Sequence, residues 1–248
     1  MVSGERPATM ADSGATLVDE AIILVGGRGT RLQSVVSDVP KPLAPVGGRP
    51  FLAWLLDLLR AQGMRRVILA TGHMAKQVEA FVGSDWSGMD VDYSHETSPM
   101  GTGGAVQQAV ARLQGESVHV LNGDTFLRYA PSGLVAATSR IGAGIGVALA
   151  HVDDVARYGA VGVHDGRVTG FQEKGGRGPG MINAGSYYFS RAGLALLGRA
   201  TPFSLETEVL VPQAERGNIA AFCDTSGFID IGVPEDYERA QRMFGAHA

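Results

Sequence analysis

A short apolar run near the start of the chain ends abruptly in a glycine-rich loop. Residues 21–25 read Ala-Ile-Ile-Leu-Val, and Gly26-Gly27-Arg28-Gly29-Thr30-Arg31-Leu32 follows directly. An apolar run of this length, bounded by glycine, is typical of a buried strand. Glycines at the carboxyl end of a strand let backbone N–H groups turn inward around an anion. This junction predicts an α/β protein whose first loop binds phosphate.

Two basic residues accompany the loop: Arg31 lies within it and Lys41 lies in Pro40-Lys41-Pro42. Both side chains carry a positive charge that suits phosphate oxygens. The spacing excludes a dinucleotide fingerprint, because the third glycine would fall at Leu32, and it excludes a P-loop, because no G-K-[S/T] closes the loop. A glycine-rich turn with an exposed arginine is the alternative that the loop alone leaves open.

Composition narrows the class of protein further. With 248 residues, 45% of them hydrophobic, the chain suits one α/β domain. Its formal net charge of −4, with both signs interspersed, provides no basic stripe for a nucleic acid polymer or an anionic membrane surface. No apolar run approaches the length of a membrane span. We therefore expect no nucleic acid partner and no membrane partner.

The first residues and the lone cysteine give two smaller expectations. Residues 1–19 mix charged residues with Ser, Gly and Thr, which predicts a disordered leader before a domain over residues 20–248. Cys223 is the single cysteine, so it forms no internal disulfide, which suits a reducing cytosol. We expect its side chain to be a small buried hydrophobe.

Strand and helix patterns alternate up to residue 121. The pattern predicts strands at 67–70, 91–94 and 118–121, and helices at 51–62, 74–82 and 104–113. After Pro131 come the strand-like runs 145–150, 160–164, 168–173 and 182–189, then helices at 204–214 and 234–244. We predict a single α/β domain with a Rossmann-like, doubly wound, mixed but mostly parallel sheet.

Two aspartates expected at strand ends are candidate metal ligands, although Asp230 considered alone is an ordinary strand-end residue. Asp124 lies in Asn122-Gly123-Asp124-Thr125, and Asp230 lies in Phe228-Ile229-Asp230-Ile231-Gly232. Asp124 is expected on the edge of the sheet that carries the first glycine loop, where open α/β sheets bind ligands. Mg²⁺ prefers one or two carboxylates together with phosphate oxygens and water. The alternative for the first motif is a hairpin turn, because Asn-Gly between apolar runs is a strong hairpin signal.

A second glycine cluster, Pro99-Met100-Gly101-Thr102-Gly103-Gly104-Ala105, precedes a predicted helix. Its glycines allow a flat ligand to approach closely, and the free N–H groups at the start of a helix can donate to it. A plain helix-start loop is the alternative when the segment is considered alone.

These motifs together resemble those of a known family. G-G-x-G-T-R-L followed by P-K is similar to the signature of the sugar nucleotidyltransferases, and the resemblance extends over residues 20–244. It implies the nucleotidyltransferase fold and a nucleobase site around the second glycine cluster. The nucleotide-binding residues that it implies are Leu24, Gly26, Gly27, Gly29, Thr30, Gly101, Thr102, Gly103, Asn122 and Gly123.

The resemblance also implies which side chains act on phosphate. Arg31 would favour the leaving pyrophosphate, Lys41 the α-phosphate and Lys174 the attacking sugar phosphate. Asp124 and Asp230 match the two metal aspartates of the family, so Mg²⁺ is the implied cofactor. Transfer then needs no general base, because a sugar phosphate is already ionised at neutral pH and positioned cations supply most of the catalysis.

Four further residues match segments that contact the sugar. Glu173 and Asn183 would bond sugar hydroxyls, and Tyr158 and Gly159 lie in a segment that lines the sugar pocket in the family. Considered in isolation, Glu173 reads as part of a surface ion pair, Asn183 as a turn residue and Tyr158 as a core side chain.

The implied reaction joins a nucleoside triphosphate to a sugar 1-phosphate and releases pyrophosphate. Within the family the motifs are most similar to those of enzymes that use GTP and D-glycero-D-manno-heptose 1-phosphate to make GDP-heptose for bacterial surface polysaccharide. A mannose-1-phosphate guanylyltransferase, a muramate-type 1-phosphate uridylyltransferase and a catalytically silent nucleotide-sugar sensor are the alternatives. The oligomeric state stays open, a homo-oligomer included.

Overall fold

A ten-stranded mixed sheet forms the centre of the protein. The computed structural model describes residues 18–27, 32, 36 and 38–245. The strand order is β10-β11-β13-β9-β12-β7-β1-β4-β6-β5, and three strands, β5, β11 and β12, run against the other seven. The predicted fold class, a mixed and mostly parallel sheet with helices around it, is confirmed.

The first half of the chain follows the predicted alternation. Four adjacent parallel strands come from this half: β7 (Val118–Asn122), β1 (Glu20–Leu24), β4 (Arg66–Thr71) and β6 (Met89–His95). The short β5 (Asp85–Trp86) lies beside β6 at the edge of the sheet. The helices between them are α1 (Phe51–Ala61), α2 (Ala75–Val82) and α3 (Gly101–Val110). Gly63 ends the first of these with φ +90°, as its position after the helix predicts.

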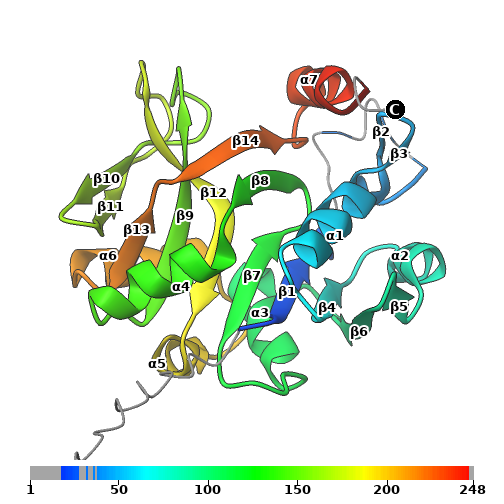
Figure 1. Ribbon diagram of the computed structural model, residues 1–248, viewed down its shortest axis with the longest axis horizontal. Helices are drawn as coiled ribbons and strands as arrows, with labels where there is room; N and C mark the ends of the chain where they lie inside the picture. Colours follow the sequence, from blue (N-terminus) through cyan, green and yellow to red (C-terminus); the bar gives the residue numbers. More distant parts are fainter. Residues whose placement is uncertain (1–17, 28–31, 33–35, 37, 246–248) are drawn as a thin grey trace, which may run out of the picture.

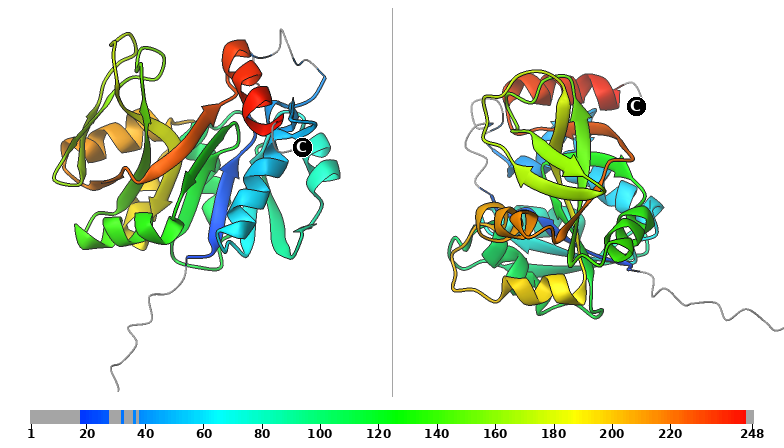
Figure 2. Two further views of the ribbon diagram at one scale, coloured as in Figure 1. Left: turned by 45° about the horizontal axis from the view of Figure 1, so that its top comes forward. Right: turned by 90° about the vertical axis from the view of Figure 1, so that its left-hand side faces the viewer.

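Alternate residues of each central strand face two different helical layers. Ile22 and Ile68 pack in a core with α3, whereas Ala21, Ile23 and Val67 pack in a core with α1 and α2. Figure 1 and the right-hand view of Figure 2 show α1 and α4 on one side of the sheet and α3, α5 and α6 on the other. Because the apolar runs are buried on both faces, the sheet is doubly wound.

The second half is antiparallel in part, as predicted. It contributes β9 (Ile145–Val152), β10 (Val161–His164), β11 (Arg167–Phe171), β12 (Gly180–Phe189) and β13 (Ile219–Phe222). Helix α4 (Pro131–Arg140), the short α5 (Arg191–Leu194) and η2 (Ala195–Leu197), and β13 were not predicted. The predicted helix at 204–214 spans residues 205–215 and combines the π-helical η3 (Glu206–Leu210) with α6 (Val211–Glu215). The Ser204 hydroxyl caps it by accepting from Thr207 N at 3.2 Å.

A smaller two-stranded sheet crosses the end of the main one. Strand β8 (Thr125–Tyr129) pairs antiparallel with β14 (Thr225–Asp230), about a hundred residues later in the chain. The Asn122-Gly123-Asp124 turn therefore joins strands of two different sheets, and the hairpin alternative is wrong. Helix α7 (Pro234–Gly245) follows β14 and packs on the hairpin of β2 (Pro45–Val46) and β3 (Arg49–Pro50).

The expectation about Cys223 needs correction. Cys223 is exposed in the turn after β13, so the expected burial is wrong; the strand ends at Phe222 and the turn leaves the core.

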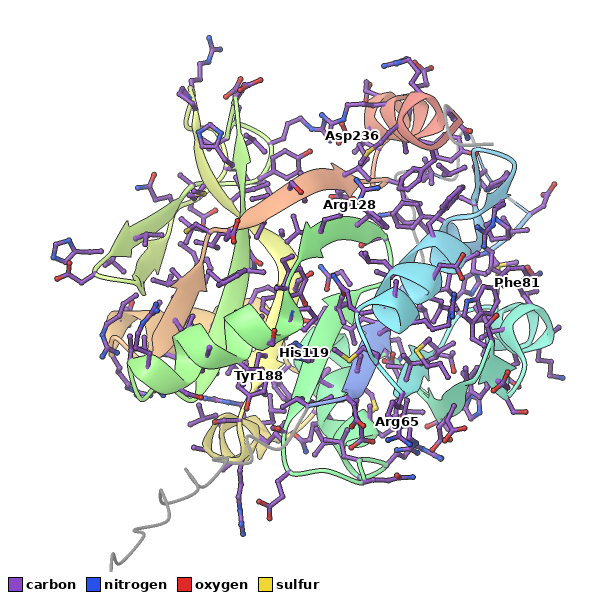
Figure 3. The ribbon with its side chains drawn as sticks, in the orientation of Figure 1. Arg65, Phe81, His119, Arg128, Tyr188 and Asp236 are labelled. Atoms are coloured by element: carbon purple, nitrogen blue, oxygen red, sulfur yellow. The ribbon has the colours of Figure 1, made fainter. Side chains whose placement is uncertain are left out.

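His119 on β7 is fully buried, and burial lowers its pKa to about 4. Figure 3 shows His119 beside Tyr188, whose ring centroid is 5.5 Å away. In the described part of the chain, no helix combines the length and hydropathy of a membrane span.

Candidate functional site

Two adjoining hollows open where β1 ends. The first, which we call the charged cavity, has a volume of about 510 Å³. The charged and aromatic side chains that line it are Lys41, Asp124, Arg157, Tyr158, Lys174 and Asp230. The second, the glycine-lined pocket, has a volume of about 490 Å³ and is lined by Gly26, Gly72, Glu96, Gly101, Thr102 and others. Leu24 and Gly27 line both, so one extended ligand can occupy the two together.

The two aspartates predicted as metal ligands meet in the charged cavity. Pairing of β8 with β14 places Asp230 opposite Thr125, and Ile231 N donates to the Asp124 carbonyl at 3.0 Å. Lys41 Nζ lies 2.5 Å from Asp124 Oδ2 and 3.9 Å from Asp230 Oδ1. The tertiary structure thus brings together an acid pair and a lysine that lie far apart in the sequence.

Electrostatics makes this acid pair receptive to a cation. Burial raises the pKa of Asp230, and the neighbouring Asp124 carboxylate raises it further, while Lys41 opposes the shift. Two carboxylates in one cavity destabilise each other's ionised form unless positive charge lies between them. The described residues contain no group of three or more His, Cys, Asp or Glu side chains that could hold a metal. Two carboxylates beside phosphate nevertheless fit Mg²⁺, which takes its other ligands from phosphate and water.

Lys41 is held in place by the short helix η1 (Lys41–Leu43). Leu43 N donates to the Pro40 carbonyl at 2.7 Å, and Ala44 N donates to the Lys41 carbonyl at 3.0 Å. Pro42 and Leu43 are buried, so the turn is anchored in the core while the lysine head reaches the acids. The predicted Pro-Lys-Pro segment is therefore part of the site, with only 14% of the Lys41 side chain exposed.

Lys174 and Tyr158 come from two segments that are hydrogen-bonded to each other. Gly175 N donates to the Ala156 carbonyl at 3.0 Å, and Gln172 N donates to the Ala160 carbonyl at 2.8 Å. Gly159 has φ +83°, and a Cβ there would lie 2.3 Å from the Gln172 carbonyl oxygen. Only glycine permits this close approach, so Gly159 fixes the wall of the charged cavity although it does not line it.

Glu96 is a residue of the site that the motifs did not single out. Its carboxylate is half-buried in the glycine-lined pocket, and its Oε2 accepts from Met100 N at 3.1 Å. A Cβ on Gly26 would lie 2.6 Å from Glu96 Oε1, so the glycine leaves room for this carboxylate. Burial raises the pKa of Glu96, and the Met100 N–H opposes that shift. An acidic residue five positions before Gly101, at a strand end, was the available signal.

The second glycine cluster has a structural as well as a lining role. Helix α3 begins at Gly101, three residues earlier than predicted, and Gly101 has φ +73°. Gly101 and Thr102 line the pocket, but a Cβ on Gly103 would lie 2.1 Å from the Phe203 ring. Thr102 Oγ1 donates to Glu206 Oε2 at 2.6 Å, so its hydroxyl is engaged within the protein.

The remaining predicted residues line neither hollow or lie outside the described part. Asn183 Nδ2 donates to the Tyr187 hydroxyl at 3.0 Å, and Asn183 Oδ1 accepts from Gly185 N at 3.0 Å, which fixes a bulge in β12. Gly123 N donates to the Leu24 carbonyl at 2.9 Å. The predicted residues that line neither hollow are Gly103, Asn122, Gly123, Gly159, Glu173 and Asn183. Gly29, Thr30 and Arg31 lie outside the described residues.

The fold and the site define a class of protein. A Rossmann-like sheet with an acid pair, two lysines and a glycine-lined pocket beside the end of β1 is the arrangement that the family resemblance implies. Residues 20–245 match the nucleotidyl transferase family, to which the chain therefore belongs. This membership confirms the predicted enzyme class.

Three known proteins are similar to this chain over most of its length. The chain is 38% identical to D-glycero-alpha-D-manno-heptose 1-phosphate guanylyltransferase of Aneurinibacillus thermoaerophilus over 90% of this chain and 97% of that one. It is 34% identical to mannose-1-phosphate guanylyltransferase of Mycobacterium tuberculosis over 91% of this chain and 64% of that one. The crystal structure of HddC from Yersinia pseudotuberculosis complexed with GMP-PN superposes with a TM-score of 0.80 at 36% identity, covering 92% of this chain and 100% of HddC.

Proposed function

We propose that this protein is a guanylyltransferase that joins GTP to D-glycero-D-manno-heptose 1-phosphate, forming GDP-heptose and pyrophosphate. The observation that carries the proposal is Glu96, a carboxylate in the glycine-lined pocket next to the charged cavity. The similarity to relatives named as heptose 1-phosphate guanylyltransferases, over nearly their whole length, supports the same substrate pair.

The chemistry of Glu96 favours guanine over uracil. Guanine presents two adjacent donors, N1–H and the N2 amino group, and an ionised carboxylate accepts both. Uracil presents one N–H between two carbonyl oxygens, which would lie against the carboxylate and leave polar groups unpaired. Met100 N–H already fixes one Glu96 oxygen, and a carboxylate has lone pairs left for a base. A site of this kind rejects the wrong base strongly.

The charged cavity suits the transfer itself. The sugar phosphate is the nucleophile and attacks the α-phosphorus, a new P–O bond forms, and the bond to the departing pyrophosphate breaks. Lys174 is proposed to hold the attacking phosphate and Lys41 to stabilise the α-phosphate, because both line the cavity. Positioned cations lower the repulsion between two anions and stabilise the charge on pyrophosphate. Arg31 is proposed to contribute on the pyrophosphate side.

Mg²⁺ is the proposed cofactor, with Asp124 and Asp230 as its protein ligands. The acid pair fits it, because the mutual repulsion of the two carboxylates is relieved by a cation. When bound, the metal supplies positive charge to the triphosphate. Tyr158, which lines the charged cavity, is proposed to shape the sugar subsite together with Gly159, Glu173 and Asn183.

We extend the proposal to a cytoplasmic enzyme that supplies GDP-heptose for bacterial surface polysaccharide. This step is supported by the family resemblance and by a single exposed cysteine without a disulfide partner, which suits a reducing compartment.

A matrix of substrates tests the proposal. GTP and UTP are each paired with manno-heptose 1-phosphate and mannose 1-phosphate, with Mg²⁺, and pyrophosphate release gives kcat/KM. We expect GTP to exceed UTP by roughly 10⁴-fold, and heptose to exceed mannose by roughly 10- to 200-fold, because the sugars differ by one CH(OH) group. Equal or better turnover with UTP would overturn the guanylyl assignment, and mannose 1-phosphate as the better sugar would replace the heptose assignment.

A further inference from the structure

Arg157 links the charged cavity to helix α7, and none of the motifs accounts for it. Its side chain lines the cavity beside Tyr158 and Lys174 and is 46% exposed. Arg157 Nη2 donates to Asp236 Oδ2 at 2.6 Å, which joins the loop after β9 to the first turn of α7. Among the described residues, Asp236 is the one hydrogen-bond partner found for this guanidinium, which leaves N–H donors for a ligand.

Asp236 is a buried carboxylate that has other hydrogen-bond and ion-pair partners besides Arg157. Figure 3 shows it at the start of α7, and its side chain is 4% exposed. Besides Arg157, Asp236 accepts from the Tyr158 hydroxyl at 3.0 Å and lies 3.5 Å from Arg239 Nη2. A buried carboxylate must be paired, and Arg239 can supply a balancing charge without Arg157. The two arginines and the one aspartate together carry a net positive charge. Arg157 is the member of this cluster that lines the cavity.

We propose that Arg157 is a second cation for the phosphate of the sugar 1-phosphate, and that Asp236 is the residue that positions it. This inference rests on the proposed function. A phosphate monoester carries a charge between −1.5 and −2 near pH 7. Lys174 alone balances only part of that charge. Arg157 lies on the same wall, since the segments that carry the two side chains are joined by the Gly175 N to Ala156 O hydrogen bond of 3.0 Å.

The guanidinium of Arg157 suits binding of the sugar phosphate, because this planar group can bind two phosphate oxygens at once. Asp236 restricts the side chain to one orientation, which lowers the entropy lost on binding. Arg157 therefore acts on the nucleophile, and it differs from Lys41, which lies against the acid pair.

Steady-state kinetics of Arg157→Met, with the substrate pair that the wild-type enzyme turns over best, tests the proposal. We expect KM for the sugar 1-phosphate to rise roughly 10- to 100-fold, as for loss of a charge-assisted bidentate contact, with the Kd for the triphosphate within about 2-fold of wild type. In the reverse reaction, KM for pyrophosphate should not change. A rise in KM for pyrophosphate, or an unchanged KM for the sugar phosphate, overturns the proposal.

Arg239→Met is the matched control. It removes the other arginine beside Asp236, and this arginine is not among the residues that line the cavity. We expect its KM values to equal those of the wild type. An equal rise in KM for the sugar phosphate in both variants would contradict a direct role of Arg157. Inactivity of the wild-type enzyme with every substrate pair would instead contradict the proposed function, so the two failures are distinguishable.

A double-mutant cycle tests the role of Asp236. Asp236→Asn should raise KM for the sugar phosphate by roughly 3- to 10-fold in the wild type and have no further effect in Arg157→Met, because coupled residues are not additive. A purely structural role of Asp236 would give the same increase in both backgrounds, and that result would overturn the positioning role.

Discussion

The charged cavity and the glycine-lined pocket share a strand end but are built differently. Residues that line the pocket come from neighbouring parts of the chain, between Leu24 and Ala105, and most are small. The charged side chains of the cavity come from positions as far apart as Lys41 and Asp230. Recognition of a flat base needs mainly close backbone approach and one well-placed acceptor, whereas phosphoryl chemistry needs several charges that converge on one point.

This difference predicts that substitutions in the two hollows should have different kinetic effects. Changes in the charged cavity should reduce turnover with every base, and changes in the glycine-lined pocket should alter the choice of base while leaving the chemistry in place.

The largest effect is expected for Asp124→Asn. Loss of one carboxylate from the acid pair removes a ligand charge at a proposed metal that stabilises the transferring phosphate, so kcat should fall roughly 10²-fold or more. The fold should remain intact, and the preference for GTP should not change. Pyrophosphate release at several Mg²⁺ concentrations measures this, with the exposed Asp90→Asn on β6 as the control. Near-normal turnover of Asp124→Asn would end its assignment as a metal ligand.

Glu96→Gln should affect the base alone. The amide offers one acceptor and places an N–H donor toward guanine's donors, so kcat/KM for GTP should fall by roughly 10- to 100-fold. Inosine triphosphate, which lacks the N2 amino group, sharpens the test because it already lacks one of the two contacts. The ratio of GTP to inosine triphosphate should therefore shrink in the variant. An unchanged ratio would show that Glu96 does not bind the guanine edge.

Lys174→Ala and Lys41→Ala should differ from each other within the charged cavity. Lys174→Ala should raise KM for the sugar 1-phosphate by about 10-fold or more, with little change for the triphosphate, whereas Lys41→Ala should lower kcat. Isothermal titration with the triphosphate alone provides the second measurement. A large loss of triphosphate affinity in Lys174→Ala would contradict this division.

The smallest effect on turnover is expected for Gly103→Ala, at a glycine that does not line the pocket but packs against Phe203. A Cβ on Gly103 would meet the Phe203 ring at 2.1 Å, so Gly103→Ala should cost about 1–3 kcal/mol of stability through overpacking. Gly27→Ala is the matched control for stability, because nothing lies within 4 Å of its Cβ position. Urea unfolding compares the two variants. Equal stability of both would mean that Phe203 moves aside without cost.

Local pattern was sufficient to predict most elements of the first half. The apolar runs 21–25, 67–70 and 118–121 predicted β1, β4 and β7, because strands buried on both faces leave a nearly continuous apolar signature. The run 91–94 predicted β6, which is only partly buried. Helix α4 was missed, since its sequence Pro-Ser-Gly-Leu-Val-Ala-Ala-Thr-Ser-Arg carries a weak apolar pattern. The Asn-Gly turn was ambiguous for a different reason: a turn signal says where the chain reverses but not which strand it pairs with.

The sequence by itself predicted the class of enzyme, because glycines at a strand end, two aspartates and two lysines together match the motifs of one family, although each motif alone left a structural alternative open. Only the tertiary structure decided which of them meet. Pairing of β8 with β14 brings Asp124 to Asp230, and helix α7 brings Asp236 to Arg157. The sequence signal for Glu96 was only an acidic residue at a strand end, and the packing of Gly26 and Gly72 beside its carboxylate decides that it lies in the pocket. Such contacts join residues distant along the chain, and their geometry follows from how strands and helices pack together, which no local sequence pattern encodes.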